Sequence, residues 1–259
     1  MQQLTQNVIQ WIKDYFKDNT DGKVIIGISG GKDSTIVAAL CVEALGADRV
    51  IGVLMPNGTQ SDIQDSYKVC HYLGIDPVVF NIGSAYDNMI RQLVPPQFLT
   101  HDTISSIKTN LPSRLRMCAL YTIAAMCPNS RVVNTSNFSE RYIGYSTKFG
   151  DGAGDFSPIG NLTVREVLAI GDDLGLPYEL VHKTPSDGMS GMSDEDKLGF
   201  TYAELDDYLN GKDISNEAKE KIERLHSINL HKMKDIPRFK EECNWIIKEE
   251  FKVNYDEHI

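Results

Sequence analysis

A short glycine-rich loop between a buried strand and a helix constrains the fold of this chain more than any other feature. Residues 24–28 form an apolar run that suits a strand buried on both faces. The loop Ser29-Gly30-Gly31-Lys32-Asp33-Ser34 follows, and apolar residues at helical spacing continue from there to Gly46. In a parallel sheet, such a loop lies at the carboxyl end of its strand, where ligands bind. Its glycines let a phosphate approach the backbone, and the N–H groups of the helix N-terminus attract the negative charge.

The rest of the first 150 residues alternates between strand and helix patterns. Strands are predicted at 50–55, 78–82 and 131–135, and helices at about 3–17, 62–73, 84–92 and 111–127. This alternation predicts an α/β fold, a doubly wound parallel sheet with helices on both faces.

The pattern becomes helical after residue 150. Helices are predicted at about 163–174, 202–209, 215–226 and 237–251, and the second of them opens with the capping box Thr201-x-x-Glu204. Because no linker separates this region from the sheet, we expect one domain over residues 1–259. It would consist of a nucleotide-binding core at about 20–185 and a helical tail at about 190–259.

Composition restricts where the protein works and what it binds. The net charge of −10 over 259 residues argues against a nucleic-acid partner. No apolar run is long enough for a membrane span, and the N-terminus lacks the features of a signal peptide. The five cysteines form no C-x-x-C pair, and Cys41 lies on an apolar helical face. We therefore expect a cytoplasmic protein without a membrane or nucleic-acid partner, and a core position for Cys41.

The loop differs from two common nucleotide-binding loops. A Walker A loop requires glycine and serine or threonine where this chain has Ile26 and Asp33, and Gly27, Gly30 and Gly31 do not match the dinucleotide spacing G-x-G-x-x-G. The remaining pattern, S-G-G-x-D-S, resembles the signature of the ATP pyrophosphatase superfamily. Members of that superfamily cleave ATP between the α and β phosphates and form an adenylate.

Three later blocks resemble the ammonia-dependent NAD synthetases. They are N-x-x-x-R-x-R-M at 110–117, the run at 134–159 that contains Thr147-Lys148-Phe149-Gly150-Asp151-Gly152, and the blocks at 183–186 and 193–202. The resemblance spans roughly residues 2–240. It implies an adenine-nucleotide alpha-hydrolase-like fold and an enzyme that amidates deamido-NAD with ammonia through an adenylated nicotinate carboxylate.

The resemblance also implies a homodimer and a set of site residues. Asp33, Glu140 and Lys148 would be catalytic, and Asp33 and Glu140 would hold Mg²⁺, which prefers oxygen ligands. The co-substrate ATP would be bound by Gly27, Ser29, Gly30, Gly31, Lys32, Asp33, Ser34, Thr135 and Ser186. Deamido-NAD would be bound by Arg114, Lys148, Asp155, His231 and Lys232. A solvated surface position is the alternative for Arg114, Lys148, His231 and Lys232.

Four positions depart from the family pattern. Lys32 stands where Gln or Ile is common, Asn134 replaces a glycine, and Ser186 replaces a threonine. Val164 stands where the family has an ATP-binding lysine, with Arg165 beside it. One basic contact to the phosphates is therefore missing or has moved, and Lys32 either reaches a phosphate or points to solvent.

Other functions remain open from the sequence. A tRNA-modifying enzyme shares the loop, although it would carry a basic module or catalytic cysteines. The departures leave room for an amide ligase that acts on another carboxylate, and for a catalytically silent nucleotide-binding paralogue. The sequence has no room for a glutaminase domain, so free ammonia is the expected nitrogen donor.

Overall fold

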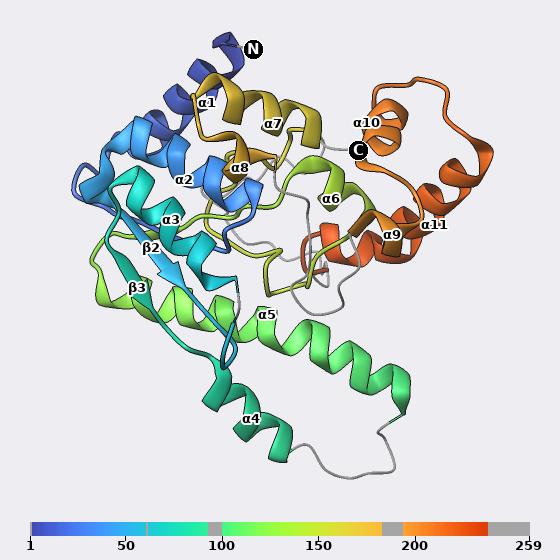
Figure 1. The fold of residues 1–259 in the computed structure, drawn as a ribbon, viewed down its shortest axis with the longest axis horizontal. Coiled ribbons are helices and arrows are strands. Elements are labelled where there is room, and N and C mark those ends of the chain that lie inside the picture. Colours follow the sequence, from blue (N-terminus) through green and yellow to red (C-terminus); the bar gives the residue numbers. More distant parts are fainter. Residues whose placement is uncertain (1, 61, 93–99, 183–193, 238–259) are drawn as a thin grey trace, which may run out of the picture.

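A parallel four-stranded sheet forms the centre of the protein (Figure 1). The computed structural model describes residues 2–60, 62–92, 100–182 and 194–237. The strands, in the order β3-β2-β1-β4, are β1 (Val24–Gly27), β2 (Val50–Leu54), β3 (Pro77–Val79) and β4 (Arg131–Val132). The order reverses between β1 and β4, and ligands bind at such a switch point in open α/β sheets. The loop after β1 therefore opens at the position where the fold favours a ligand.

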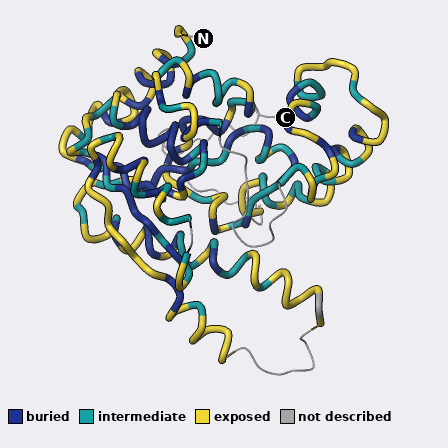
Figure 2. The backbone as a smooth tube through the Cα atoms, viewed as in Figure 1, coloured by how far each residue is buried: buried dark blue, intermediate teal, exposed yellow. Residues whose placement is uncertain are grey.

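Helices cover both faces of the sheet, as the sequence predicts. Ile25, Val53 and Val132 point to one face, where they pack against α5 (His101–Met126). Val24 and Ile26 point to the other face. The helices there are α1 (Gln2–Tyr15), α2 (Lys32–Leu45), α3 (Ile63–Leu73), α7 (Val164–Asp173) and α8 (Tyr178–Val181). Figure 2 shows the sheet and α2 largely buried, and Cys41 of α2 is fully buried, as expected.

Three boundaries of the predicted core elements are wrong, and the first is the end of the strand expected over 78–82, which the structure ends at Val79. The helix expected from about 111 begins at His101, because Thr100 and Thr103 form a capping box and Pro112 is accommodated inside the helix. Proline usually marks the first turn of a helix, which is why the sequence suggested a later start. The strand expected over 131–135 ends at Val132, because the chain then pairs with Phe156 through a single bridge at Val133.

The remaining helices lie outside the layers that cover the sheet. The short 3₁₀ turn η1 (Ala47–Arg49) precedes β2, and α4 (Gly83–Gln92) precedes α5. The others are α6 (Phe138–Ile143), α9 (Asp194–Leu198), α10 (Tyr202–Leu209) and α11 (Asn216–Met233). In Figure 1, α4 and the first half of α5 project away from the sheet. None of the helices in the described part of the chain is long and apolar enough to cross a membrane.

The helical region after residue 150 follows the prediction in part. The expected capping box at Thr201 is present, and α10 has the predicted bounds. The next helix continues to Met233 instead of ending near 226, because His226 and Asn229 hydrogen-bond to the backbone of α6. The helix predicted at 237–251 lies outside the described residues. The organisation as a single domain with a helical tail stays a prediction.

A buried carboxylate joins three of these helices. The Asp206 side chain is 1% exposed and accepts hydrogen bonds from the Ser139 hydroxyl at 2.5 Å and from the Arg165 backbone N–H at 2.8 Å. Ser139 Oγ in turn accepts from the Val164 N–H at 3.1 Å. This network fixes α6 against the first turn of α7 and against α10, and α6 also carries Glu140.

Removing the Asp206 carboxylate should destabilise the fold, because the buried Ser139 hydroxyl loses its acceptor and the Arg165 N–H loses its partner. We expect Asp206→Ala to cost about 2–3 kcal/mol, or roughly 5–10 °C in Tm, measured by thermal and urea unfolding. Asp207→Ala is the matched control, because the partly exposed side chain of Asp207 pairs with the exposed ends of Arg165 and Lys212 at the surface. Equal losses in the two variants would contradict the structural role of Asp206.

Candidate functional site

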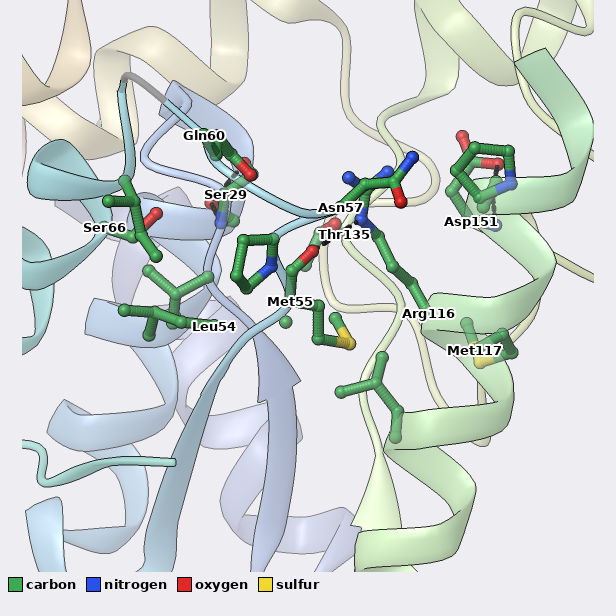
Figure 3. A pocket seen from close by; sticks show the side chains of 18 of the residues that line it. Ser29, Leu54, Met55, Asn57, Gln60, Ser66, Arg116, Met117, Thr135 and Asp151 are labelled. Carbon is green, nitrogen blue, oxygen red and sulfur yellow. Dashed lines mark hydrogen bonds between the residues drawn. The ribbon is translucent and has the colours of Figure 1, made fainter. Parts of the chain in front are cut away.

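A cavity of about 540 Å³ lies at the carboxyl ends of β1 and β2 (Figure 3). The loop after β1 contributes Ser29 and Ser34 on one side, and α5 contributes Arg116 and Met117 on the other. Thr135, which follows β4, lies between them. Of the residues expected to bind ATP, the structure thus places Gly27, Ser29, Ser34 and Thr135 on one cavity.

The loop after β1 holds its shape through its own contacts. Gly30 has φ of +78°, and a Cβ there would lie 2.9 Å from Cβ of Asp65, so the position requires glycine. Ser34 Oγ accepts the Ser29 N–H at 3.2 Å and lies 3.0 Å from Ser29 Oγ. Gly31 is the N-cap of α2, and no described side chain caps this helix end. The first N–H groups of α2 therefore remain available to an anion.

Asp33 and Glu140 meet around the ammonium of Lys32. Lys32 Nζ lies 2.6 Å from Asp33 Oδ2 and 3.9 Å from Glu140 Oε1. Asn137 is fully buried and connects the two carboxylates: its Nδ2 donates to Asp33 Oδ1 at 3.1 Å, and its Oδ1 accepts the Glu140 N–H at 2.9 Å. The predicted metal ligands are therefore neighbours. Asn137 was not predicted, although an asparagine three residues before Glu140 is a signal for a helix N-cap.

Burial and the close contact of these charges shift the pKa values of Glu140 and Lys32. Burial, followed by the Asp33 charge, raises the pKa of Glu140 to about 8, and the Lys32 ammonium opposes that rise. Burial by itself would lower the pKa of Lys32, but Asp33 and Glu140 together raise it. The Lys32 ammonium, held mainly by Asp33, therefore occupies the position where the metal is expected.

The donor chemistry of this cluster fits a magnesium ion. Two carboxylates from different segments suffice for a protein site in which phosphate oxygens complete the ligand sphere. The ammonium of Lys32 stands in for the cation between them. Tyr202, whose ring lies 5.7 Å from Lys32 Nζ, has a buried hydroxyl with no hydrogen-bond partner among the described residues. The unpartnered Tyr202 hydroxyl could therefore hydrogen-bond to a polar group of a ligand bound beside Lys32.

A second cavity, of about 510 Å³, gathers residues expected to bind deamido-NAD. Lys148, Asp155 and Lys232 line it, and Asn134 lines both cavities. Lys148 Nζ donates to the His231 carbonyl at 2.5 Å, and Lys232 Nζ donates to the Gly144 carbonyl at 2.8 Å. The end of α6 and the segment that follows it are thus joined to the end of α11 beside this cavity.

Asp155 is fixed at the edge of the sheet. Its Oδ2 accepts the Val132 N–H at 2.7 Å, and its Oδ1 accepts the Tyr121 hydroxyl at 3.0 Å. Arg114 lies nearby on α5, and its Nε donates to the Lys148 carbonyl at 3.3 Å. Asp155 and Arg114 therefore lie with Lys148 on the side of the second cavity.

Asn134, which replaces a glycine of the family pattern, orders the segment between the two cavities. Its amide donates to the carbonyls of Asp151 and Ala153, and its carbonyl oxygen accepts from Ser136 N–H and the Ser157 hydroxyl. All four hydrogen-bonding positions of this side chain are used. The change adds order to the loop without filling either cavity.

His231, which was expected to bind deamido-NAD, does not reach the second cavity. The His231 ring bonds within its own helix, to the Ile228 carbonyl at 3.2 Å, and lines neither cavity. Ser186 lies outside the described residues. Val164 is buried in an apolar cluster with Tyr202, and Arg165 pairs with Asp207 at 3.0 Å. Neither residue supplies the cation expected at the start of α7.

Arg116 is a cavity residue that the sequence analysis did not select. Its Nε donates to the Met55 carbonyl at the end of β2 at 3.0 Å, and in Figure 3 the side chain extends from α5 toward Asn57 and Thr135. Burial lowers the pKa of Arg116, and the Asp151 charge opposes that shift. The second arginine of the R-x-R-M block was the available signal.

Comparisons with known proteins agree with this geometry. The family model described as NAD synthase matches residues 4–255. The chain is 37% identical to the NH(3)-dependent NAD(+) synthetase of Alkaliphilus metalliredigens, over 88% of this chain and 94% of that protein. The NMN synthetase of Francisella tularensis aligns with a TM-score of 0.80 and 36% identity, over 92% and 98% of the two chains. The NH3-dependent NAD synthetase of Campylobacter jejuni aligns with a TM-score of 0.72 and 29% identity, over 93% and 98%. The chain belongs to the NAD synthase family.

Proposed function

We propose that this protein amidates the nicotinate carboxylate of deamido-NAD with ammonia, at the expense of ATP. The observation that carries the proposal is the meeting of Asp33 and Glu140 beside the open N-terminus of α2, where the adjacent Ser34 lines the first of two cavities that share Asn134. The family supports the nicotinate carboxylate as substrate and ammonia as nitrogen donor. It does not favour the tRNA-modifying or catalytically silent alternatives.

The reaction has two steps. A carboxylate is a poor electrophile, so an oxygen of the nicotinate carboxylate first attacks the α-phosphorus of ATP and pyrophosphate leaves. Ammonia then attacks the carbonyl carbon of the adenylate, AMP leaves with the acyl oxygen, and the nitrogen loses a proton. Both steps depend mainly on alignment and on stabilisation of phosphate charge.

The described residues divide these tasks. The first N–H groups of α2, with Ser29 and Ser34, bind the phosphates of ATP, and Thr135 contacts the nucleotide. Asp33 and Glu140 hold Mg²⁺, which neutralises charge on the transferring phosphate. Lys148 and Asp155 orient the second substrate so that its carboxylate reaches the region of Asn134, where the two cavities meet.

A second candidate substrate is nicotinate mononucleotide. The similarity to the Francisella tularensis NMN synthetase extends over nearly the whole of both chains. The same adenylation chemistry applies to both acids, since both carry the nicotinate carboxylate. The candidates differ only in whether the second cavity receives an adenylate half as well.

We also place the reaction in the cytoplasm. The four cysteines of the described residues, Cys41, Cys70, Cys118 and Cys127, are free thiols, which is usual in a reducing compartment.

A direct assay separates the two substrates. Purified protein with Mg-ATP and ammonium should release AMP in the presence of deamido-NAD, in equal amount to the NAD formed. We expect kcat/KM for deamido-NAD to exceed that for nicotinate mononucleotide at least 10-fold. The reverse preference would establish the second candidate. If neither deamido-NAD nor nicotinate mononucleotide causes AMP release, both candidates are refuted.

Asp33→Asn tests the carboxylate pair. Because the variant removes a charged metal ligand but keeps the size of the side chain, kcat should fall at least about 100-fold. Tm should fall as well, because the buried Lys32 ammonium loses its charged partner, so the rate is measured at a temperature where the variant is folded. Asp76→Asn, at an exposed carboxylate before β3, is the control and should retain the wild-type rate. A fully active Asp33→Asn would refute the metal role of this residue.

We further propose that the active protein is a homodimer. Exposed apolar side chains gather on the projecting helices α4 and α5, including Met89, Ile90 and Ile104. Patches of this kind commonly mark interfaces. Light scattering coupled to gel filtration should give a dimeric mass, and Ile104→Lys should shift it toward the monomer. A monomeric active wild type would contradict this proposal.

A further inference from the structure

Lys32 occupies an unusual position for a lysine in a nucleotide-binding loop. It is the first residue of α2, and only 8% of its side chain is exposed. Instead of pointing to solvent or toward the first cavity, it points to the carboxylates of Asp33 and Glu140, and its ammonium lies over the Tyr202 ring. A buried ammonium requires such compensation.

The ammonium and a metal ion cannot share these carboxylates. Magnesium binds carboxylate oxygens at about 2.0–2.1 Å, within the space that Lys32 Nζ holds at 2.6 Å from Asp33 Oδ2. Two cations that close repel strongly in a buried site. The other oxygen of Asp33, Oδ1, already accepts a hydrogen bond from Asn137, and a metal ion bound there would still lie close to the Lys32 ammonium. Lys32 must therefore move before a metal ion reaches the pair.

The phosphates of ATP offer a second partner to the displaced ammonium. Lys32 lies in the same helical turn as Ser34, which lines the first cavity, and its long side chain can turn about four single bonds. At the start of α7, Val164 is packed in an apolar cluster and Arg165 is bound to Asp207. Neither residue competes with Lys32 for the phosphates.

We propose that Lys32 is a displaceable internal cation that couples metal binding to nucleotide binding. In the nucleotide-free protein it neutralises Asp33 and Glu140 and keeps metal ions out. When ATP arrives, Lys32 transfers its ammonium to the phosphates, and the carboxylates become available to the metal. The inference rests on the proposed function for the identity of the nucleotide, but it concerns binding and needs no turnover.

Binding of Mn²⁺, followed by electron paramagnetic resonance, tests this coupling. The wild type alone should bind Mn²⁺ weakly. With α,β-methylene-ATP bound, the protein should bind Mn²⁺ at least 10-fold more tightly than the free nucleotide analogue does. Lys32→Gln should bind Mn²⁺ alone at least 10-fold more tightly than the wild type. Lys32→Arg, which keeps the charge, should remain as weak as the wild type.

Lys68→Gln is the matched control, because Lys68 also pairs with a carboxylate, Asp65 at 2.9 Å, but is exposed. It should leave Mn²⁺ binding unchanged. An unaltered or weaker affinity in a folded Lys32→Gln, or equal affinities in the Gln and Arg variants, would overturn the proposal. If Lys32→Gln does not fold, a crystal structure of the wild type with Mn²⁺ and the ATP analogue tests the proposal instead.

In that crystal structure, a Lys32 ammonium still bound to Asp33 would overturn the proposal, and a Lys32 ammonium bound to a phosphate would support it. Failure of the amidation assay with normal Mn²⁺ coupling would refute only the proposed function.

Discussion

A buried ammonium requires carboxylates around it, and at the N-terminus of α2 the ion pair of Lys32 and Asp33 meets this requirement. The pair determines what surrounds it. Asn137 holds the other oxygen of Asp33 and caps α6, which brings Glu140 to the same ammonium. Because Ser139 binds Asp206, α6 is fixed in turn against α7 and α10. The helical region therefore does more than cover the sheet, since it supplies and orients half of the charged cluster.

Strand order explains why the cluster lies beside two cavities. The direction of chain progression reverses between β1 and β4, so the segments that leave these strands diverge and leave room between them. The segment after β1 carries the phosphate loop, and the segment after β4 carries Asn134, Thr135 and Asn137. Asn134 lies where the cavities meet and ties the loop through Asp151 and Ala153 to the strand end. In the proposed reaction, this geometry would bring the two substrates together where the cavities meet.

Local signals in the sequence were sufficient for much of this arrangement. The strand, loop and helix from Val24 to Leu45 were predictable because burial and glycine act over a few neighbouring residues, and the Thr201 capping box gave the bounds of α10. Signals that depend on distant partners failed. The roles of Asn137 and Arg116 follow from contacts with Asp33 and Met55, far away in the chain. The sequence did not predict the direction of the Lys32 side chain for the same reason, since its contacts with Glu140 and Tyr202 are distant in the chain. The early start of α5 is a different kind of miss, because it rests on a local capping box at Thr100.

Two departures from the family pattern have one physical explanation. The resemblance places a lysine at the start of α7, where this chain has Val164, and an uncharged residue where it has Lys32. Val164 and Tyr202 belong to one apolar cluster, and the Tyr202 ring lies 5.7 Å from the Lys32 ammonium. An apolar side chain at position 164 completes the packing around Tyr202, and this packing in turn helps to bury Lys32. We interpret the two changes as the transfer of one positive charge from the start of α7 to the start of α2. Because the relocated charge is in contact with Asp33, it would act on the proposed metal ligands as well as on the phosphates, a combination that is not available to a lysine bound only to phosphate.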